Sequence, residues 1–230
     1  MRTMAHRENE SRDLRSRVGE FERAFAAALI AGDEIAAETT IREAMDARLT
    51  SAEIDENVIT PALWLLGELW ERGEISVADE HLATEIAMRV LALQREADRV
   101  MQGRRGHRVM LATPAGERHV VALRMVSNLL SGAGYWIVML GADVPPEALV
   151  ASVLRHRPDV ICLSATMPAL SVRVLESIQQ VRAAYPTAQF VIGGRGLSSQ
   201  LRSLSGVGIC HRVSEVVEAV DAKVKRAELN

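Results

Sequence analysis

The sequence has few aromatic residues, few cysteines and no excess of either charge. Only 3% of its 230 residues are aromatic, so each of the three tryptophans merits separate inspection. The two cysteines, Cys162 and Cys210, lie far apart without a C-x-x-C motif, which argues against a disulfide scaffold or a cysteine zinc site. The 27 basic residues nearly balance the 30 acidic ones, and a net charge of -3 argues against a protein that mainly coats nucleic acid or anionic membranes.

Long apolar segments are also absent. No stretch approaches the roughly 18 consecutive apolar residues of a membrane span, and the charged N-terminus lacks the apolar region of a signal peptide. We therefore expect a cytoplasmic protein that does not associate with a membrane. The hydrophobic share of 48% is enough to bury a substantial core.

The first half of the chain has the hydrophobic spacing of four amphipathic helices. The predicted elements are a charged tail or frayed helix start over 1–17, then helices over about 21–31, 34–48, 50–72 and 76–101. Gly32-Asp33 suits the end of one helix and the cap of the next, and Thr50 with Glu53 forms a capping box. Pro61 either kinks the third helix or marks its true start. Short connections predict a four-helix bundle over residues 18–102.

A linker rich in glycine and arginine, residues 102–107, precedes a segment of different periodicity. Five short apolar runs follow it, starting at Val109, Trp136, Val160, Phe190 and Val207. Helical patterns lie between and after them, near 117–131, 146–156, 169–184, 197–204 and 214–227. This alternation predicts an α/β domain over residues 108–230, with a parallel, flavodoxin-like (Rossmann-like) sheet covered on both faces. Its ligand should bind outside the carboxyl ends of the strands.

Side chains with chemical capability follow three of the predicted strands. They are Glu117 and His119 after the first strand, Ser164 and Thr166 after the third, and Gly193-Gly194 after the fourth. Because the carboxyl ends of parallel strands meet at one edge, we expect these residues to converge. The glycine pair would let a bulky group approach the backbone. Neither glycine loop completes a P-loop or a G-x-G-x-x-G motif, so a dinucleotide is not indicated.

His119 is the strongest candidate for a metal ligand. The sequence predicts it in the first turn of a helix, where the helix dipole disfavours a charged imidazolium and favours the neutral, ligating form. Glu117, two residues earlier, would bind the second ring nitrogen and fix the tautomer. The alternative is an ordinary surface histidine, and the predicted convergence with Ser164 and the glycine pair argues against it.

A second group of residues lies around the end of the third predicted helix and the start of the fourth. It comprises Trp64, Trp70, Glu80 and His81. Taken alone, Trp70 is typical of a core residue and Glu80-His81 of a solvated helix start. No two-histidine spacing or E-x-x-H repeat accompanies them, which argues against a di-iron bundle.

In this order, the motifs resemble cobalamin-binding modules of the methionine-synthase type. That family joins a four-helix bundle to a flavodoxin-like domain, holds the corrinoid between them, and carries D-x-H-x-x-G, then S-x-L or S-x-T, then G-G. The matching segments here are Glu117-Arg118-His119-Val120-Val121-Ala122, Ser164-Ala165-Thr166 and Gly193-Gly194. The resemblance covers nearly all of residues 20–225 and implies a cobalamin cofactor.

The resemblance also implies roles for these residues. His119 would be the lower axial cobalt ligand, replacing the cofactor's own dimethylbenzimidazole, and Glu117 and Ser164 would support it by hydrogen bonding. The slot for the displaced nucleotide tail would be lined by Ser164, Thr166, Gly193 and Gly194. Two departures stand out: Glu117 replaces the commoner aspartate and adds a methylene, and Ala122 replaces the motif glycine and would crowd the tail.

Nine residues separate Trp70 from Glu80-His81, and this spacing resembles the light-sensing, cobalamin-dependent repressors of carotenoid genes. In that subfamily these residues cover the upper face of the cofactor, light breaks the cobalt–carbon bond, and the bundle moves. Those repressors carry an upstream DNA-binding domain that residues 1–19 cannot hold, so we expect no direct nucleic-acid binding by this chain. They also have a histidine after the tryptophan. Glu71 stands there here, which leaves His81 as the nearby candidate for a second cobalt ligand.

Three functions remain open at this point. The favoured one is a sensor that binds adenosylcobalamin or methylcobalamin and signals through a protein partner or self-association. The second is a corrinoid methyl carrier for a separate methyltransferase, although a tryptophan over the cofactor would hinder access to the methyl group. The third is a partner-binding protein without corrinoid, against which the motif around His119 argues. The small subunit of a radical mutase is less favoured, because such subunits usually lack the bundle.

Overall fold

The computed structural model describes residues 4–98 and 106–228 of the chain. The chain divides into two compact units, one ending at Gln94 and the other beginning at Arg95. The predicted linker over 102–107 lies largely outside the described residues, so the domain limits 18–102 and 108–230 remain predictions.

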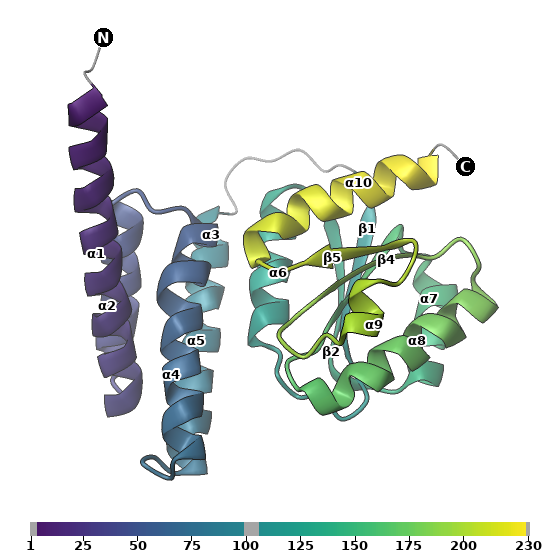
Figure 1. The fold of residues 1–230 in the computed structure, drawn as a ribbon, viewed down its shortest axis with the longest axis horizontal. Coiled ribbons are helices and arrows are strands. Elements are labelled where there is room, and N and C mark those ends of the chain that lie inside the picture. The colour runs from purple at the N-terminus through teal and green to yellow at the C-terminus, as the bar shows by residue number, and fades with distance from the viewer. Residues whose placement is uncertain (1–3, 99–105, 229–230) are drawn as a thin grey trace. The chain divides into compact units, whose positions relative to one another are not determined.

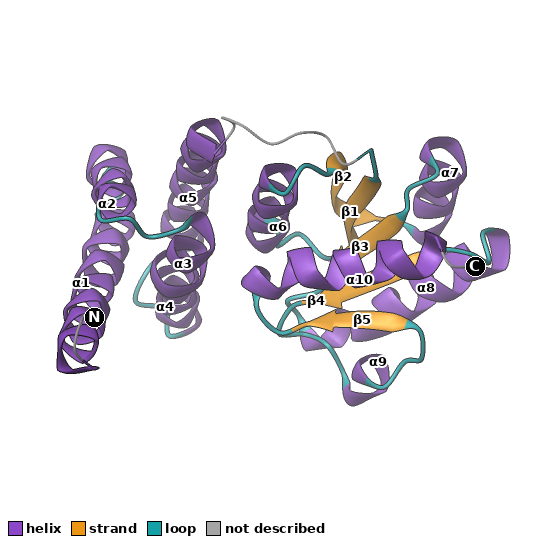
Figure 2. Ribbon diagram, turned by 90° about the horizontal axis from the view of Figure 1, so that it is seen from above, coloured by secondary structure: helices purple, strands orange, loops and turns teal. Residues whose placement is uncertain are grey.

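The N-terminal unit is helical, as predicted. Its long helices are α1 (Met4–Ala31), α2 (Glu34–Asp46), α4 (Thr60–Glu71) and α5 (Val77–Asp98). A short helix α3 (Ser51–Ile54) and a π-helical turn (Asp55–Ile59) lead directly into α4. Figures 1 and 2 show α1 beside α2 and α4 beside α5, which confirms the helix bundle.

The predicted helix caps are present. The Asp33 carboxylate accepts the Ala36 N–H at 2.9 Å at the start of α2. Thr50 and Glu53 form the reciprocal capping box, in which the Glu53 carboxylate accepts the Thr50 N–H at 2.8 Å. Pro61 lies in the first turn of α4, but the chain is already helical through α3 and the π-helical turn, so the proline stands within a continuous helical segment and starts no new helix. Proline has no N–H to donate and clashes with the preceding turn, and the wider π-helical turn before it accommodates both effects.

The start of α1 differs from the expectation. The sequence predicts a tail or a frayed helix start over residues 1–17, whereas α1 is helical from Met4. This segment is rich in arginine, glutamate and other good helix formers and contains neither proline nor glycine. Such a helix has no apolar stripe, so hydrophobic periodicity cannot detect it.

The C-terminal unit contains a five-stranded, fully parallel sheet with the order β2-β1-β3-β4-β5. Its strands are β1 (Arg108–Pro114), β2 (Trp136–Val144), β3 (Val160–Ser164), β4 (Gln189–Gly193) and β5 (Val207–Cys210). This is the predicted flavodoxin-like order. The carboxyl ends of all five strands lie at one edge, where the sequence places the candidate residues.

Five helices connect and cover the strands. They are α6 (Val121–Gly132), α7 (Pro146–His156), α8 (Ser171–Ala184), α9 (Ser199–Arg202) and α10 (Val216–Glu228), with short 3-10 turns at Pro168–Leu170 and Val213–Glu215. Helices α6 and α10 cover one face of the sheet, and α7, α8 and α9 cover the other (Figures 1 and 2). The sequence predicts longer first and fourth helices, but α6 begins only at Val121 and α9 is a single turn.

Successive side chains of the strands pack into two cores, one on each face of the sheet. In β1, the fully buried Val109 and Leu111 pack on the side of α6 and α10, while Met110 and Ala112 pack on the side of α7 and α8. Both cysteines are free thiols, and burial raises the pKa of Cys210 to about 11. None of the helices in the described ranges combines the length and apolarity that a bilayer crossing requires.

Candidate functional site

The turn that follows β1 places the first candidate residues. The Glu117 N–H donates to the Pro114 carbonyl at 3.0 Å and closes the turn. Gly116 occupies it with a φ of 83°, in the left-handed region that glycine adopts without a steric penalty. The turn leaves the Glu117 side chain fully buried.

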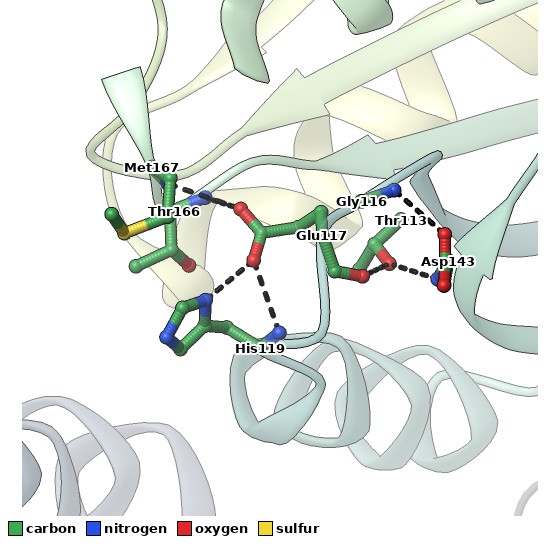
Figure 3. A network of polar contacts seen from close by, with 7 residues as sticks. All are labelled: Thr113, Gly116, Glu117, His119, Asp143, Thr166 and Met167. Carbon is green, nitrogen blue, oxygen red and sulfur yellow. Dashed lines mark hydrogen bonds and ion pairs between the residues drawn. The ribbon is translucent and has the colours of Figure 1, made fainter. Parts of the chain in front are cut away.

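The Glu117 carboxylate accepts four hydrogen bonds from N–H groups (Figure 3). One oxygen, Oε1, accepts from the His119 backbone N–H at 3.1 Å and from the His119 ring nitrogen Nδ1 at 2.5 Å. The other, Oε2, accepts from the backbone N–H groups of Thr166 at 2.7 Å and Met167 at 3.0 Å. The carboxylate therefore joins the loop after β1 to the loop after β3.

These bonds determine the charge of Glu117. Burial acts to raise the pKa of this carboxyl group. The ring of His119 and the backbone N–H groups of Met167, His119 and Thr166 act in the opposite direction and lower the pKa to about 2. Glu117 is consequently an anion at neutral pH, and it can only accept hydrogen bonds.

The anionic Glu117 fixes the tautomer of His119. Because the carboxylate accepts from Nδ1, that nitrogen carries the proton, and the lone pair of the neutral imidazole lies on Nε2. The His119 side chain is 55% exposed, so it remains accessible to a ligand. Among the described residues, no group of three or more His, Cys, Asp or Glu side chains could hold a bare metal ion.

The sequence predicts His119 in the first turn of a helix. In the structure it lies in the loop before α6. Its backbone N–H is bonded to the Glu117 side chain, so the chain turns helical only from Val121. The tautomer and the orientation of the imidazole are therefore set by the carboxylate of Glu117, which contacts Nδ1 directly.

Of the two residues predicted to act after β3, Thr166 contacts Glu117 only through its backbone, and Ser164 does not contact the carboxylate in the described parts of the chain. Ser164 is buried at the end of β3, and its hydroxyl is not among the donors to Glu117 in the described parts of the chain. The carboxylate is already satisfied by four N–H groups, two of them from the next loop. Thr166 contributes through its backbone N–H to this support.

The glycines after β4 allow two loops to pack together. Gly194 has a φ of 108°, and a Cβ built on it would lie 2.1 Å from the Ala165 carbonyl oxygen. A Cβ on Gly196 would lie 2.7 Å from the Met167 carbonyl, and the Gly196 N–H donates to the Ala165 carbonyl at 2.9 Å. The bulky group that approaches Gly194 in this structure is therefore the backbone of the loop after β3. Gly193 precedes it as the last residue of β4.

Two residues of the network are not among the sequence-derived candidates for the site. Thr113 is fully buried, and its hydroxyl donates to the Glu117 carbonyl at 2.5 Å. Asp143, near the end of β2, accepts the Gly116 N–H on Oδ1 at 2.7 Å (Figure 3). The signal in the sequence is the segment 141–146, in which glycine, aspartate and two prolines follow an apolar run at the same edge of the sheet.

The second group of candidates lies on the surface of the N-terminal unit. Trp64 and Trp70 of α4 are each 48% exposed, so Trp70 is not the core residue that its type alone suggests. In α5, the Glu80 carboxylate contacts Nδ1 of His81 at 2.7 Å and accepts the Thr84 hydroxyl at 3.0 Å. Further exposed apolar side chains of α4 and α5 are Leu65, Val77 and Leu82.

Known protein families match the sequence of both units. A model of the B12 binding domain matches residues 107–221, and a second B12 binding domain model matches residues 22–94. The chain is 32% identical over 170 residues to the HTH-type transcriptional repressor CarA of Myxococcus xanthus, covering 72% of the chain and 57% of CarA. It is 30% identical over 191 residues to CarH of the same organism, covering 82% of the chain and 62% of CarH. The chain thus spans less than two thirds of either repressor.

Corrinoid proteins are also similar. The trimethylamine corrinoid protein of Methanosarcina barkeri is 27% identical over 200 residues, which cover 85% of the chain and 90% of that protein. The solved structure of the Methanosarcina barkeri monomethylamine corrinoid protein has the same fold, with a TM-score of 0.69 at 19% identity over 90% of this chain and 99% of that one. The chain belongs to the family of B12-binding proteins, and its cofactor is cobalamin.

Proposed function

We propose that this chain is a cobalamin-dependent light sensor. In this proposal His119 is the lower axial ligand, and Trp70, Glu80 and His81 cover the upper face of the cofactor. The observation that carries the proposal is the surface exposure of Trp70 on α4, which lies beside α5, the helix of Glu80 and His81 (Figures 1 and 2).

The residues around His119 fit a corrinoid cobalt. His119 would hold the cobalt of a corrinoid in place of the cofactor's own base, since an imidazole with its lone pair on Nε2 is a nitrogen donor to metals. Glu117 holds the proton on Nδ1 and increases the electron density on the ring, as carboxylate partners of metal-bound histidines do. The buried Glu117 stays ionised over the physiological pH range and so continues to accept from Nδ1 of His119.

The exposed face of the N-terminal unit fits the role of an upper cap. An indole that is half exposed leaves apolar area in water, which makes Trp70 a candidate contact residue. On the neighbouring helix α5, the Glu80 carboxylate contacts Nδ1 of His81, as Glu117 does with His119. This surface could exclude water from a ligand and register its presence or loss.

The light response would come from the cofactor, whose cobalt–carbon bond to an adenosyl or methyl group is cleaved by visible light. The chain's own contribution is a set of contacts that differ with and without the upper group. A protein state is shifted only by such a difference in contacts. We assign these contacts with the upper group to Trp70, Glu80 and His81.

The nucleotide tail of the cofactor would bind near the carboxyl edge of the sheet, beside Ser164, Thr166, Gly193 and Gly194. The close approach of Ala165 to Gly194 keeps the two loops together there. Output would pass to a protein partner or to a second copy of the chain. We include a role in transcription regulation in the proposal, because CarA and CarH are named as HTH-type transcriptional repressors. The match covers 57% of CarA and 62% of CarH.

The alternative is a methyl carrier that serves a separate methyltransferase. It is favoured by the similarity to the trimethylamine corrinoid protein, 90% of which the match covers. A carrier must expose its methyl group to an enzyme, and the two exposed tryptophans would then contact that enzyme in place of capping the cofactor.

The two functions can be separated by spectroscopy. The purified chain is loaded in the dark with adenosylcobalamin or methylcobalamin, and absorption spectra and mass in solution are recorded before and after green light. A sensor retains the cofactor, is photolysed and changes its oligomeric state or helix exposure. A photolysed complex with no change in either property, combined with rapid demethylation by a methyltransferase, would favour the carrier.

Two variants assign the residues. His119→Ala should bind cofactor without the histidine-ligated spectrum, and an unchanged spectrum would remove His119 from its role. Trp70→Ala should leave that spectrum intact and reduce the light-dependent change. Trp136→Ala, which removes a comparably exposed tryptophan from β2 of the other unit, serves as its control.

A further inference from the structure

Asp143 has a backbone conformation that is unusual for its type. Its φ is 54°, in the left-handed region, where aspartate is tolerated better than most residues other than glycine. Such conformations persist where surrounding contacts determine them, and they concentrate at functional sites. Asp143 forms hydrogen bonds with Thr113 at the end of β1 and with Gly116 and Glu117 in the turn that follows.

Asp143 holds this turn with its side chain and its backbone. Its Oδ1 accepts the Gly116 N–H at 2.7 Å. Its own N–H donates to the Glu117 carbonyl at 2.9 Å and to the Thr113 hydroxyl oxygen at 3.1 Å. Figure 3 shows Asp143 on one side of Glu117, with His119 and the loop of Thr166 on the other.

These bonds replace regular sheet pairing. The register between β1 and β2 shifts between Leu111 and Ala112, and again between Ala112 and Pro114. The regular ladder is therefore interrupted just where β1 enters the turn. Without the ladder, the Glu117 backbone is held by the turn bond to the Pro114 carbonyl and, from outside the turn, by Asp143 and the Thr113 hydroxyl.

We propose that Asp143 is a positioning residue for the lower axial ligand. It fixes the Glu117 backbone from β2, while the N–H groups of Thr166 and Met167 fix the carboxylate from the loop after β3. Glu117 held from both sides can present His119 in one orientation. The inference rests on His119 as the cobalt ligand of the proposed function.

Three variants of the full chain test it. Asp143→Gly removes the side chain and permits the positive φ, so it deletes the bond to Gly116 without adding strain. Asp143→Asn keeps an Oδ1 acceptor and tolerates the left-handed conformation. Asp159→Ala is the matched control, because the Asp159 carboxylate also accepts a backbone N–H of β1, that of Arg108 at 2.6 Å, but at the opposite end of the strand.

Two measurements read out the effect. In the protein without corrinoid, nitrogen NMR of the 15N-labelled His119 ring reports whether Nδ1 carries the proton. In protein loaded with cob(II)alamin in the dark, electron paramagnetic resonance reports nitrogen bound to cobalt. A 15N-histidine label distinguishes the protein's imidazole from the cofactor's own base, because 15N splits the signal into two lines and 14N into three.

We expect Asp143→Gly to lower the share of histidine-ligated cobalt several-fold and to weaken the Nδ1–H signal. Asp143→Asn should restore both, and Asp159→Ala should change neither. The inference would be overturned if Asp143→Gly kept the wild-type share of histidine-ligated cobalt, or if Asp159→Ala lost as much of it as Asp143→Gly. If wild-type protein itself shows no histidine nitrogen on cobalt, the ligand assignment fails, and the NMR comparison still decides whether Asp143 positions His119.

Discussion

Replacing Glu117 with glutamine tests the electrostatics of the site most directly. The change keeps the size of the side chain but removes its charge, and the amide NH2 group then faces two N–H donors. Lowering the pKa of Glu117 from 4.5 to about 2 corresponds to roughly 3 kcal/mol, since each pKa unit is worth about 1.4 kcal/mol. We therefore expect Glu117→Gln to lower the free energy of unfolding of the C-terminal unit by about 3 kcal/mol at pH 7.

The pH dependence gives this prediction its sign. A carboxyl group with a lowered pKa in the folded state stabilises the fold above its unfolded pKa, and this stability is lost as the pH falls through the folded pKa. The difference between wild type and Glu117→Gln should thus be constant above about pH 5 and should shrink by roughly half near pH 3. Glutamine does not titrate, so the variant lacks this contribution.

The assay is urea unfolding of the full chain at pH 7, 5, 4 and 3. A Trp64→Phe/Trp70→Phe background leaves Trp136 as the sole tryptophan, so its fluorescence reports the sheet unit alone. Glu215→Gln is the matched control, because Glu215 accepts the N–H groups of His211 and Arg212 near the surface. A difference that stays the same from pH 7 to pH 3, or a loss in Glu117→Gln no larger than in Glu215→Gln, would refute the reasoning.

Three further substitutions have expected outcomes in urea unfolding. Gly194→Ala should destabilise the C-terminal unit by at least about 2 kcal/mol, because its Cβ would overlap the Ala165 carbonyl at a positive φ. Gly67→Ala should stabilise α4 by about 0.5–1 kcal/mol, because nothing lies within 4 Å of the added Cβ; weaker cobalamin binding by the same variant would indicate that this helix face contacts the cofactor. Thr113→Val should cost about 1–2 kcal/mol, because it removes the hydroxyl that donates to the Glu117 carbonyl, and Thr113→Ser should recover most of it.

The architecture could be predicted because its determinants are local. Each strand is an apolar run of β-branched and other hydrophobic residues bounded by polar or glycine-containing segments, and each run leads to a helix. The Thr50–Glu53 capping box and the Asp33 cap involve residues three apart, so the sequence alone specifies them. The contact of Glu117 with His119 is equally short in range, which is why that pair was predictable.

The remainder of the site depends on contacts between distant segments. The N–H groups of Thr166 and Met167 bind Glu117, but every non-proline residue has a backbone N–H, so no residue type signals this role. The packing of Ala165 against Gly194 likewise brings together loops that follow different strands. A glycine in the sequence indicates that something approaches closely, and only the structure identifies the Ala165 backbone as the group that does.

The two candidate groups differ in how firmly they are held, and this difference bears on how a sensor could work. Glu117 is fully buried and bonded to three N–H groups of the main chain and to the His119 ring, so moving His119 requires disturbing a buried charge. Glu80 and His81 lie on the surface with short-range contacts within α5, and the Trp70 side chain is half exposed. A conformational signal requires a group of residues that can adopt two different sets of contacts. We therefore expect the loss of an upper group to change the contacts of Trp70, Glu80 and His81, while Glu117 and His119 hold the cofactor in place.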